Sequence, residues 1–278
     1  MKKYISIIPA TLIIAGILFS CKKTDTKVNP PGQVACSVTN VSSTFAGNNS
    51  SSVYEYSTDG KLIVIKNYAG NSLALSTTLG EFSTEVKYTS SSGFSMIQTV
   101  VYEGGSIFAG QLPLKASVAL QEGMITRTDV LTYYFYYDNK NRLNKVSEET
   151  KNVVGDWEYD LFIEYNDQDN VISIKNIWRT GPNTSSTIAV SGYDDKPSPF
   201  SGLRTWKYLV SWDNSDPTAL FAQLSKNNPL GFIEGDWTRE MTYTYNEHGY
   251  PLIRSNIQKN KNTEGTATWV ETFGYNCP

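Results

Sequence analysis

The chain has 278 residues, with 40% hydrophobic and 13% aromatic side chains and a formal net charge of −3 at pH 7. This length suffices for one large domain or two small ones. The acidic balance excludes nucleic acid and other polyanions as expected partners, because such ligands are bound by basic surfaces.

Residues 1–20 have the pattern of a secretory signal peptide. Lys2 and Lys3 form its charged start, and the apolar run over residues 5–19 is short for a membrane span. The run leads into the sequence LFSC, which ends at Cys21 and resembles the lipobox of bacterial lipoproteins. The resemblance implies that Cys21 is acylated, so that the membrane becomes a partner through the lipid anchor. The alternative is an ordinary signal peptide with a chance cysteine.

The residues that follow predict a tether and a location. Residues 21–34 are polar, contain two prolines and are predicted to be a flexible tether. Lys22 and Lys23 follow the cysteine, and no aspartate is present there to retain the protein at the inner membrane. The lipobox resemblance therefore implies an outer-membrane lipoprotein that faces either the periplasm or the cell exterior. Residues 35–278 are predicted to form a single domain.

Four copies of a tyrosine-led turn divide this domain into hairpins. The copies begin at Tyr56, Tyr137, Tyr165 and Tyr245, and the fifth residue of each is glycine, asparagine or aspartate. Such residues accept a left-handed backbone, which a two-residue hairpin loop requires. We therefore predict two-residue turns at 59–60, 140–141, 168–169 and 248–249. Each tyrosine is then opposite the residue seven positions later.

This pairing separates an apolar-rich face from a polar face. Around the third turn, one face carries Leu161, Ile163, Tyr165, Ile172, Ile174 and Trp178. The other face carries Phe162, Glu164, Asn166, Val171, Ser173 and Lys175. The first turn likewise groups Tyr54, Tyr56, Ile63 and Ile65. A register slip of one residue would mix the two faces, so the separation supports the predicted pairing.

The sequence Gly-Asp-Trp occurs at 155–157 and again at 235–237, and it marks the opposite ends of the hairpins. Each copy starts a nine-residue strand, from Trp157 or Trp237 to a tyrosine, with a length of about 30 Å at roughly 3.4 Å per residue. A shortened copy is predicted to start at Trp269. Period-two patterning with turns at both ends predicts a mainly β fold, in which an antiparallel meander curls into a barrel or half-barrel.

Two further segments refine this fold. Pro217 and the apolar residues that follow it at helical spacing predict one short helix over 217–226. Residues 143–149 carry charge on both faces, with Lys145 and Glu149 on one and Glu148 on the other. A transmembrane barrel needs an outer face that is apolar throughout its membrane-spanning band, so the predicted barrel is soluble.

Two families share these features. The tyrosine-led turns resemble the YD repeats of Rhs-type wall and toxin-shell proteins. A fuller resemblance is to an uncharacterised family of Bacteroidetes-type secreted lipoproteins described as having a porin-like fold. It is carried by the lipobox cysteine, CSVTNV at the domain start, the tyrosine-rich hairpins, YDDKPSPF, SKNNPLGF and a near-terminal YNC. The resemblance implies a barrel-like meander and no catalytic activity.

Several polar residues are candidates for catalytic or metal sites. His248 is the single histidine, and its turn position predicts a solvated side chain rather than a catalytic or metal-binding one. The sequence over 166–170 and the pair at 194–195 resemble fragments of calcium loops, but asparagine and aspartate also favour turns. We expect no metal and no cofactor. Glu158 and Asp160 share a strand face with Glu164, at a spacing near that of a glycosidase pair.

Three charged residues lie on the apolar-rich face, namely Glu148, Arg239 and Arg254. Because a buried charge is costly unless it is paired, they lie either at a solvated barrel mouth or in an internal polar pocket that binds an anionic ligand. The aromatic residues either fill the core or form stacking platforms for sugars. The leading hypothesis is a non-enzymatic envelope lipoprotein that binds a glycan or another envelope protein. The alternative is a glycan-processing hydrolase that uses Glu158 and Asp160.

Cys36 and Cys277 stand at the two ends of the domain. Closure of the meander would make the first and last strands neighbours and remove their exposed edges. In an oxidising compartment the two cysteines would then form a disulfide across the seam, and two free thiols are the alternative.

Overall fold

The computed structural model describes residues 36–278 except 90–94, 106–111, 151–156, 181–184 and 201–216. The signal peptide, Cys21 and the tether predicted for residues 1–34 lie outside the described residues. No helix among the described residues is long and apolar enough to cross a membrane.

The described residues form a mainly β domain. Its strands are β1 (Ser37–Phe45), β2 (Asn48–Tyr56), β3 (Leu62–Ala69), β4 (Ser72–Leu79), β5 (Ser83–Thr89), β6 (Ser95–Glu103), β7 (Lys115–Glu122), β8 (Ile125–Tyr137), β9 (Leu143–Thr150), β10 (Trp157–Tyr165), β11 (Val171–Trp178), β12 (Ser185–Pro197), β13 (Asn227–Glu234), β14 (Trp237–Tyr245), β15 (Pro251–Asn260) and β16 (Thr266–Asn276). One short helix, α2 (Pro217–Leu224), lies between β12 and β13.

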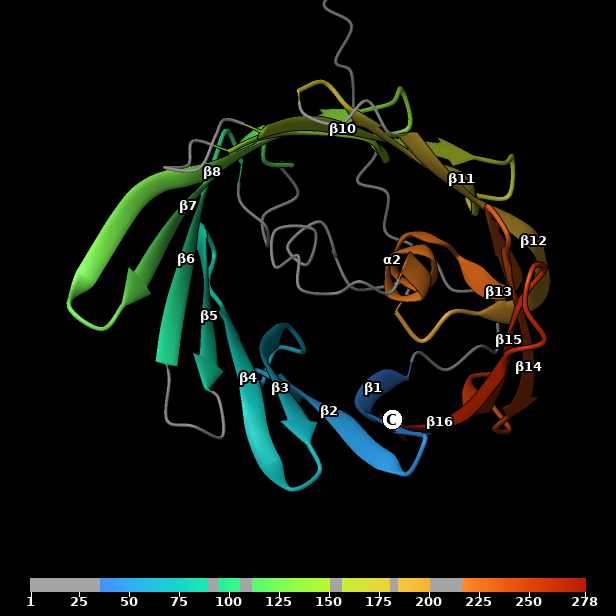
Figure 1. Ribbon diagram of the computed structural model, residues 1–278. Coiled ribbons are helices and arrows are strands. Elements are labelled where there is room, and N and C mark those ends of the chain that lie inside the picture. Colours follow the sequence, from blue (N-terminus) through green and yellow to red (C-terminus); the bar gives the residue numbers. More distant parts are fainter. Residues whose placement is uncertain (1–35, 90–94, 106–111, 151–156, 181–184, 201–216) are drawn as a thin grey trace, which may run out of the picture. The chain divides into compact units, whose positions relative to one another are not determined.

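The sheet closes into a barrel (Figure 1). Each strand pairs antiparallel with its neighbours in sequence, and β1 pairs with β16. The predicted meander is therefore confirmed, and full closure leaves no strand edge open among the described strands. Strands β10 and β14 begin at Trp157 and Trp237 and end at tyrosines, as predicted. Strand β16 differs, since it begins at Thr266 rather than at Trp269.

The tyrosine-led turns have the predicted left-handed residues but a longer loop. Asp169 has a φ of 63°, and the equivalent residue of every other copy also has a positive φ. The loop nevertheless contains three residues, because the Asn166 N–H bonds the carbonyl of Asn170 and the Asp169 N–H bonds that of Asn166. Asn166 Oδ1 accepts two further loop N–H groups, from Gln168 and Asn170. The prediction of two-residue turns was thus wrong, and a type I turn with one left-handed residue takes their place.

The longer loop produces a bulge that changes which residues face inward. Ile163 is opposite Ile174 as predicted, but Tyr165 is opposite Val171 instead of Ile172. Val171 is fully buried, whereas Ile172 is 41% exposed. The first hairpin shows the same shift, with Leu62 rather than Ile63 opposite Tyr56. The pairing predicted for the hairpin arms is confirmed, and the prediction for these end positions was wrong by one residue.

Tyrosine hydroxyls join neighbouring hairpins at one end of the barrel. The donor and acceptor pairs are Tyr56 with Val38, Tyr137 with Pro113, Tyr165 with Leu143, Tyr193 with Val171, Tyr243 with Pro229 and Tyr275 with Pro251, at 2.5 to 2.9 Å between phenol oxygen and backbone carbonyl oxygen. The accepting carbonyls lie at or near the starts of odd-numbered strands. Burial raises the pKa of Tyr56 to about 12, so this phenol remains a donor at ordinary pH. We call this the tyrosine end, and the opposite one the tryptophan end.

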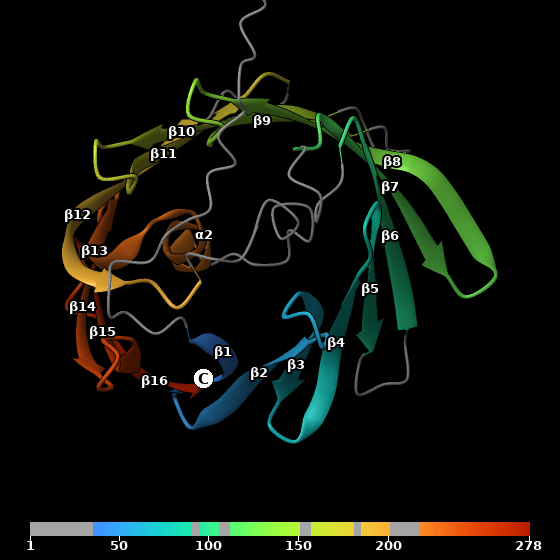
Figure 2. The ribbon, with the colours of Figure 1, turned by 180° about the vertical axis from the view of Figure 1, so that it is seen from behind.

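Helix α2 lies inside the ring of strands (Figures 1 and 2). The ring of Phe221 packs on that of Phe232 in β13, with centroids 4.7 Å apart. Ala222 packs in a second cluster with Val38 and Phe273, from the strands of the seam. A sixteen-stranded barrel encloses more space than its strand side chains fill, and α2 occupies part of that space. The helix was predicted correctly, although it ends at Leu224 rather than at residue 226.

The inner and outer faces of the barrel differ in chemistry. The inner face carries the main core cluster, with large buried side chains from β6 to β14 around Phe221. The outer face carries cross-strand ion pairs: Lys66 with Glu55, Lys115 with Glu103, Lys145 with Asp160, and Lys259 with Glu240. The main apolar core therefore lies on the inner face, and the outer face carries ion pairs together with exposed apolar side chains such as Val101 and Ile257.

The tyrosine bonds make a first prediction. Tyr165→Phe removes the bond to the Leu143 carbonyl and should lower the free energy of unfolding by about 1 kcal/mol in urea denaturation. Tyr136→Phe is the matched control, because Tyr136 is 47% exposed on the outer face of β8. It should change stability by less than about 0.5 kcal/mol. Equal effects of the two substitutions would contradict a structural role for the hydroxyl at the tyrosine end.

The seam makes a second prediction. Cys36 and Cys277 form a disulfide with Cα atoms 4.3 Å apart and a sequence separation of 241. Chain-entropy reasoning gives a loop of this length up to about 5 kcal/mol of stabilisation. The double variant Cys36→Ser, Cys277→Ser should therefore unfold at clearly lower urea concentration. Free thiols that titrate in the unreduced domain would contradict the bond. An unchanged urea midpoint in the double variant would contradict its contribution to stability.

Candidate functional site

A row of paired side chains crosses the inner wall near the tryptophan end. Tyr133 of β8 is opposite Glu148 of β9, which is opposite Tyr159 of β10. Tyr159 is in turn opposite Trp178, the last residue of β11. Directly opposite residues share a face of the sheet, and Tyr133 and Tyr159 belong to the inner core cluster, so these four side chains lie on the luminal face.

A first cavity lies against this row. It has a volume of about 180 Å³ and is lined by Glu148, Tyr159, Asn176 and Trp178. The Glu148 carboxyl accepts a hydrogen bond from the Thr150 hydroxyl at 3.1 Å. The Tyr133 and Tyr159 side chains also hydrogen-bond to it. Burial raises the pKa of Glu148 above its ordinary value, because a charged carboxylate is disfavoured away from water.

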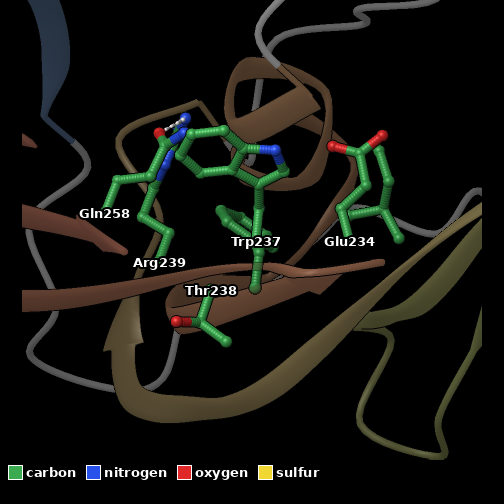
Figure 3. A pocket seen from close by; sticks show the side chains of 7 residues that line it. Glu234, Trp237, Thr238, Arg239 and Gln258 are labelled. Carbon is green, nitrogen blue, oxygen red and sulfur yellow. Dashed lines mark hydrogen bonds between the residues drawn. The ribbon is translucent and has the colours of Figure 1, made fainter. Parts of the chain in front are cut away.

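A second cavity lies further round the wall, with a volume of about 200 Å³. It is lined by Ile188, Phe232, Glu234, Trp237, Thr238, Arg239 and Gln258. In Figure 3 the indole of Trp237 stands between Glu234 and the Arg239–Gln258 pair. Arg239 Nη2 donates to Gln258 Oε1 at 2.9 Å, and the guanidinium carbon lies 4.7 Å from the ring centroid of Trp269. The cavity thus combines an exposed aromatic ring with a carboxylate, an amide and a guanidinium.

The structure does not bring the three predicted inward charges together. Glu148 lines the first cavity and Arg239 the second, whereas Arg254 lines neither. Arg254 Nη2 donates to Glu271 Oε1 at 2.7 Å, and its side chain is 8% exposed, so it does not lie at a solvated mouth. Arg254 is four residues from Gln258 on β15, a distance of about 13 Å along a strand. Gln258 is the strand partner of Arg239, so Arg254 and Arg239 are far apart.

The strand carboxylates of the hydrolase hypothesis face outward. Asp160 Oδ2 lies 3.1 Å from Lys145 Nζ, and Arg179 Nη1 lies 3.0 Å from Glu158 Oε2. Glu164 Oε2 accepts a hydrogen bond from the hydroxyl of Ser173 at 2.6 Å. All three acids are therefore engaged on the outer wall, and none of them lines either cavity.

The calcium-like segments have structural partners instead. Asp194 accepts bonds from the backbone N–H groups of Lys196 and Asn228, each at 3.0 Å. It also accepts a bond from the hydroxyl of Tyr245 at 2.5 Å. Asn166 closes its own turn, as described above. These oxygens therefore stabilise strand ends at the tyrosine end.

His248 has a different environment from the one predicted. Its side chain is 27% exposed, so the solvated side chain that the turn position predicts is only partly in contact with water. One ligand atom of His248 and the sulfur atoms of Cys36 and Cys277 all lie within 4.8 Å of one another. Since the two sulfurs are bonded to each other, they are not available as metal ligands. Only strand closure brings these residues together, so the sequence position of His248 gave no sign of it.

Sequence reasoning also missed Asn176 and Gln258 as cavity residues. Both have a recognisable signal, because the hairpin register places these amides on an otherwise apolar-rich inner face. A polar side chain on such a face needs a partner or a cavity. Trp237 was identified as a strand start, but the register does not show that its ring borders open space.

Two solved structures resemble this chain over most of its length. One is a porin-like protein from Bacteroides uniformis, with 14% sequence identity and a TM-score of 0.54, covering 88% of this chain and 99% of its own. The other is a porin-like protein from Bacteroides vulgatus, with 10% identity, a TM-score of 0.50, and 87% and 99% covered. No protein-family model and no curated protein matches the sequence. At such identities the likeness establishes the fold alone, and it agrees with the porin-like barrel that the sequence resemblance implied.

The raised pKa of Glu148 makes a third prediction. A carboxyl with a higher pKa in the folded state binds protons better there, so its contribution to stability falls as pH rises through that pKa. Glu148→Gln removes this penalty and should be more stable than the unmodified chain at pH 8. The difference in free energy of unfolding between this variant and the unmodified chain should shrink towards pH 4, by at most about 1.4 kcal/mol per pH unit. Urea titrations at each pH measure this difference, and the outward-facing Glu149→Gln is the control. A loss of stability on Glu148→Gln at pH 8 would refute the prediction.

Proposed function

We propose that this chain is a non-enzymatic barrel protein of the bacterial envelope that binds a carbohydrate in its lumen. The cavity beside Trp237 carries this proposal. Ligand sites are concave and combine aromatic surface with a few placed polar groups, as this cavity does with Trp237, Arg239, Gln258 and Glu234. An exposed indole offers a sugar ring an apolar face, while the polar groups are suited to its hydroxyls.

The N-terminal pattern supports a place in the envelope. A signal peptide over 1–20 followed by acylation of Cys21 attaches the domain to a membrane, since each buried methylene contributes about 0.8 kcal/mol. Residues 21–34 then tether the barrel to the lipid. The porin-like likeness is consistent with this location. The proposal is an outer-membrane lipoprotein, with its barrel in the periplasm or at the cell surface.

The barrel itself is proposed to lie in water beside the membrane. A spanning barrel presents a continuous apolar band about 25 Å tall to lipid. The outer face here carries the pairs Lys66–Glu55, Lys115–Glu103, Lys145–Asp160 and Lys259–Glu240. Charges at the depth of the hydrocarbon would cost about 2 to 4 kcal/mol each for the basic residues. A porin also keeps water in its lumen, whereas this lumen holds a packed core.

Binding is favoured over hydrolysis by the position of the acids. The outward-facing Glu158 and Asp160 form ion pairs with Arg179 and Lys145. A glycosidase pair must flank the scissile bond inside a site. The described cavities offer Glu234 and Glu148, each in a separate cavity, which supports recognition of a ligand rather than its cleavage.

A glycan array followed by calorimetry with the purified domain tests this proposal. Trp237→Ala should weaken the best sugar at least tenfold, which corresponds to about 1.4 kcal/mol. Arg239→Met should also weaken it, because the guanidinium is lost. The outer-face variant Tyr136→Ala is the control and should bind normally. Absence of any sugar ligand, or unchanged affinity in the Trp237 variant, would contradict lumen binding and favour a scaffolding role towards another envelope protein.

A further inference from the structure

The cavity beside Glu148 differs chemically from the one beside Trp237. Its described lining consists of Glu148, Asn176, Tyr159 and Trp178, and no basic residue is among them. The carboxyl is therefore a net negative group held in a partly buried space. Such a group is costly to keep charged, as the raised pKa of Glu148 shows.

The cavity also presents hydrogen-bond acceptors. Asn176 Nδ2 lies 3.4 Å from the Ser186 hydroxyl, whereas Asn176 Oδ1 is buried and accepts no hydrogen bond from the described residues. A buried carbonyl oxygen of this kind is destabilising until a donor reaches it. The carboxylate of Glu148 has up to about four acceptor positions. The Thr150, Tyr133 and Tyr159 side chains supply up to three donors to it.

Two aromatic rings complete the lining. The rings of Tyr159 and Trp178 lie with centroids 5.4 Å apart and planes at 48°. The face of an aromatic ring attracts a cation, most strongly for tryptophan, and the interaction strengthens when water is excluded. A carboxylate, an unsatisfied carbonyl oxygen and aromatic rings all favour the same ligand group, one that is positively charged and donates hydrogen bonds.

We propose that this cavity is a binding site for a protonated primary amine on a compact apolar or sugar-like body. An ammonium group has three donors and no acceptor, so it can satisfy Glu148 and Asn176 together. Its charge compensates that of the buried carboxylate, and the attached ring lies against Tyr159 and Trp178. The site is separate from the cavity beside Trp237, so the proposal holds whether or not a carbohydrate binds there.

A matched pair of small probes tests the charge requirement. Cyclohexylammonium and cyclohexanol share the same ring and differ in the group that would meet Glu148. Titrations of the disulfide-bonded chain at pH 8, followed by the indole and tyrosine signals in NMR spectra, should give saturable binding of the amine and at least tenfold weaker binding of the alcohol. Equal affinity of the two probes, or no binding of the amine, would overturn the proposal.

Variants locate the site. Glu148→Gln should weaken the amine at least tenfold without unfolding the chain, since it removes a buried charge and keeps the side-chain shape. Asn176→Leu removes the carbonyl oxygen and should weaken the amine about tenfold. Glu234→Gln, in the other cavity, is the matched control and should bind the amine normally. Unchanged affinity on Glu148→Gln, or an equal loss on Glu234→Gln, would assign the amine elsewhere and overturn the proposal.

Discussion

The inward strand side chains of a sixteen-stranded barrel do not fill its lumen, and much of this structure follows from that constraint. Eight strands enclose a space that inward side chains can fill, whereas sixteen enclose a channel. Here helix α2 adds to the strand side chains, because its Phe221 packs on Phe232 and its Ala222 packs beside Val38. The main apolar core thus lies inside, and the outer wall carries cross-strand ion pairs among exposed apolar side chains such as Val101 and Ile257. A water-filled porin instead has a polar lumen and a continuous outward apolar band.

Closure and the tyrosine end hold that arrangement together. Strands β1 and β16 pair along the seam, and a disulfide joins Cys36 to Cys277 beside it. At the same end, tyrosine hydroxyls of β2, β8, β10, β12, β14 and β16 bond backbone carbonyls near the starts of preceding strands, so that these hairpins are fixed to their neighbours. The two cavities lie in the other part of the lumen, near the tryptophan end. The fold therefore combines a tightly bonded end with an end that has space for ligands.

Local rules account for what the sequence predicted, and long-range geometry accounts for what it did not. The start of β14 at Trp237 follows from Gly235, whose φ of 55° suits a tight turn, and Asp169 has its predicted left-handed backbone. Two-residue and three-residue loops both need such a residue, so the sequence alone did not show the bulge. The bulge places Val171, rather than Ile172, opposite Tyr165. The environment of His248 was also missed, because it depends on strands at opposite ends of the chain. Inward amides such as Asn176 were readable from the register, but their cavity depends on how neighbouring rings pack.

The central proposal is that the wall of this barrel faces water rather than lipid. Nitroxide labels at outward positions of β6 and β14, such as Thr99 and Thr242, test it in the acylated chain bound to lipid vesicles. Both positions lie on the outer face by the strand register. We expect that a polar nickel complex reaches these labels more readily than dissolved oxygen does. A band of labels reached by oxygen and protected from nickel would show contact with hydrocarbon and contradict the claim.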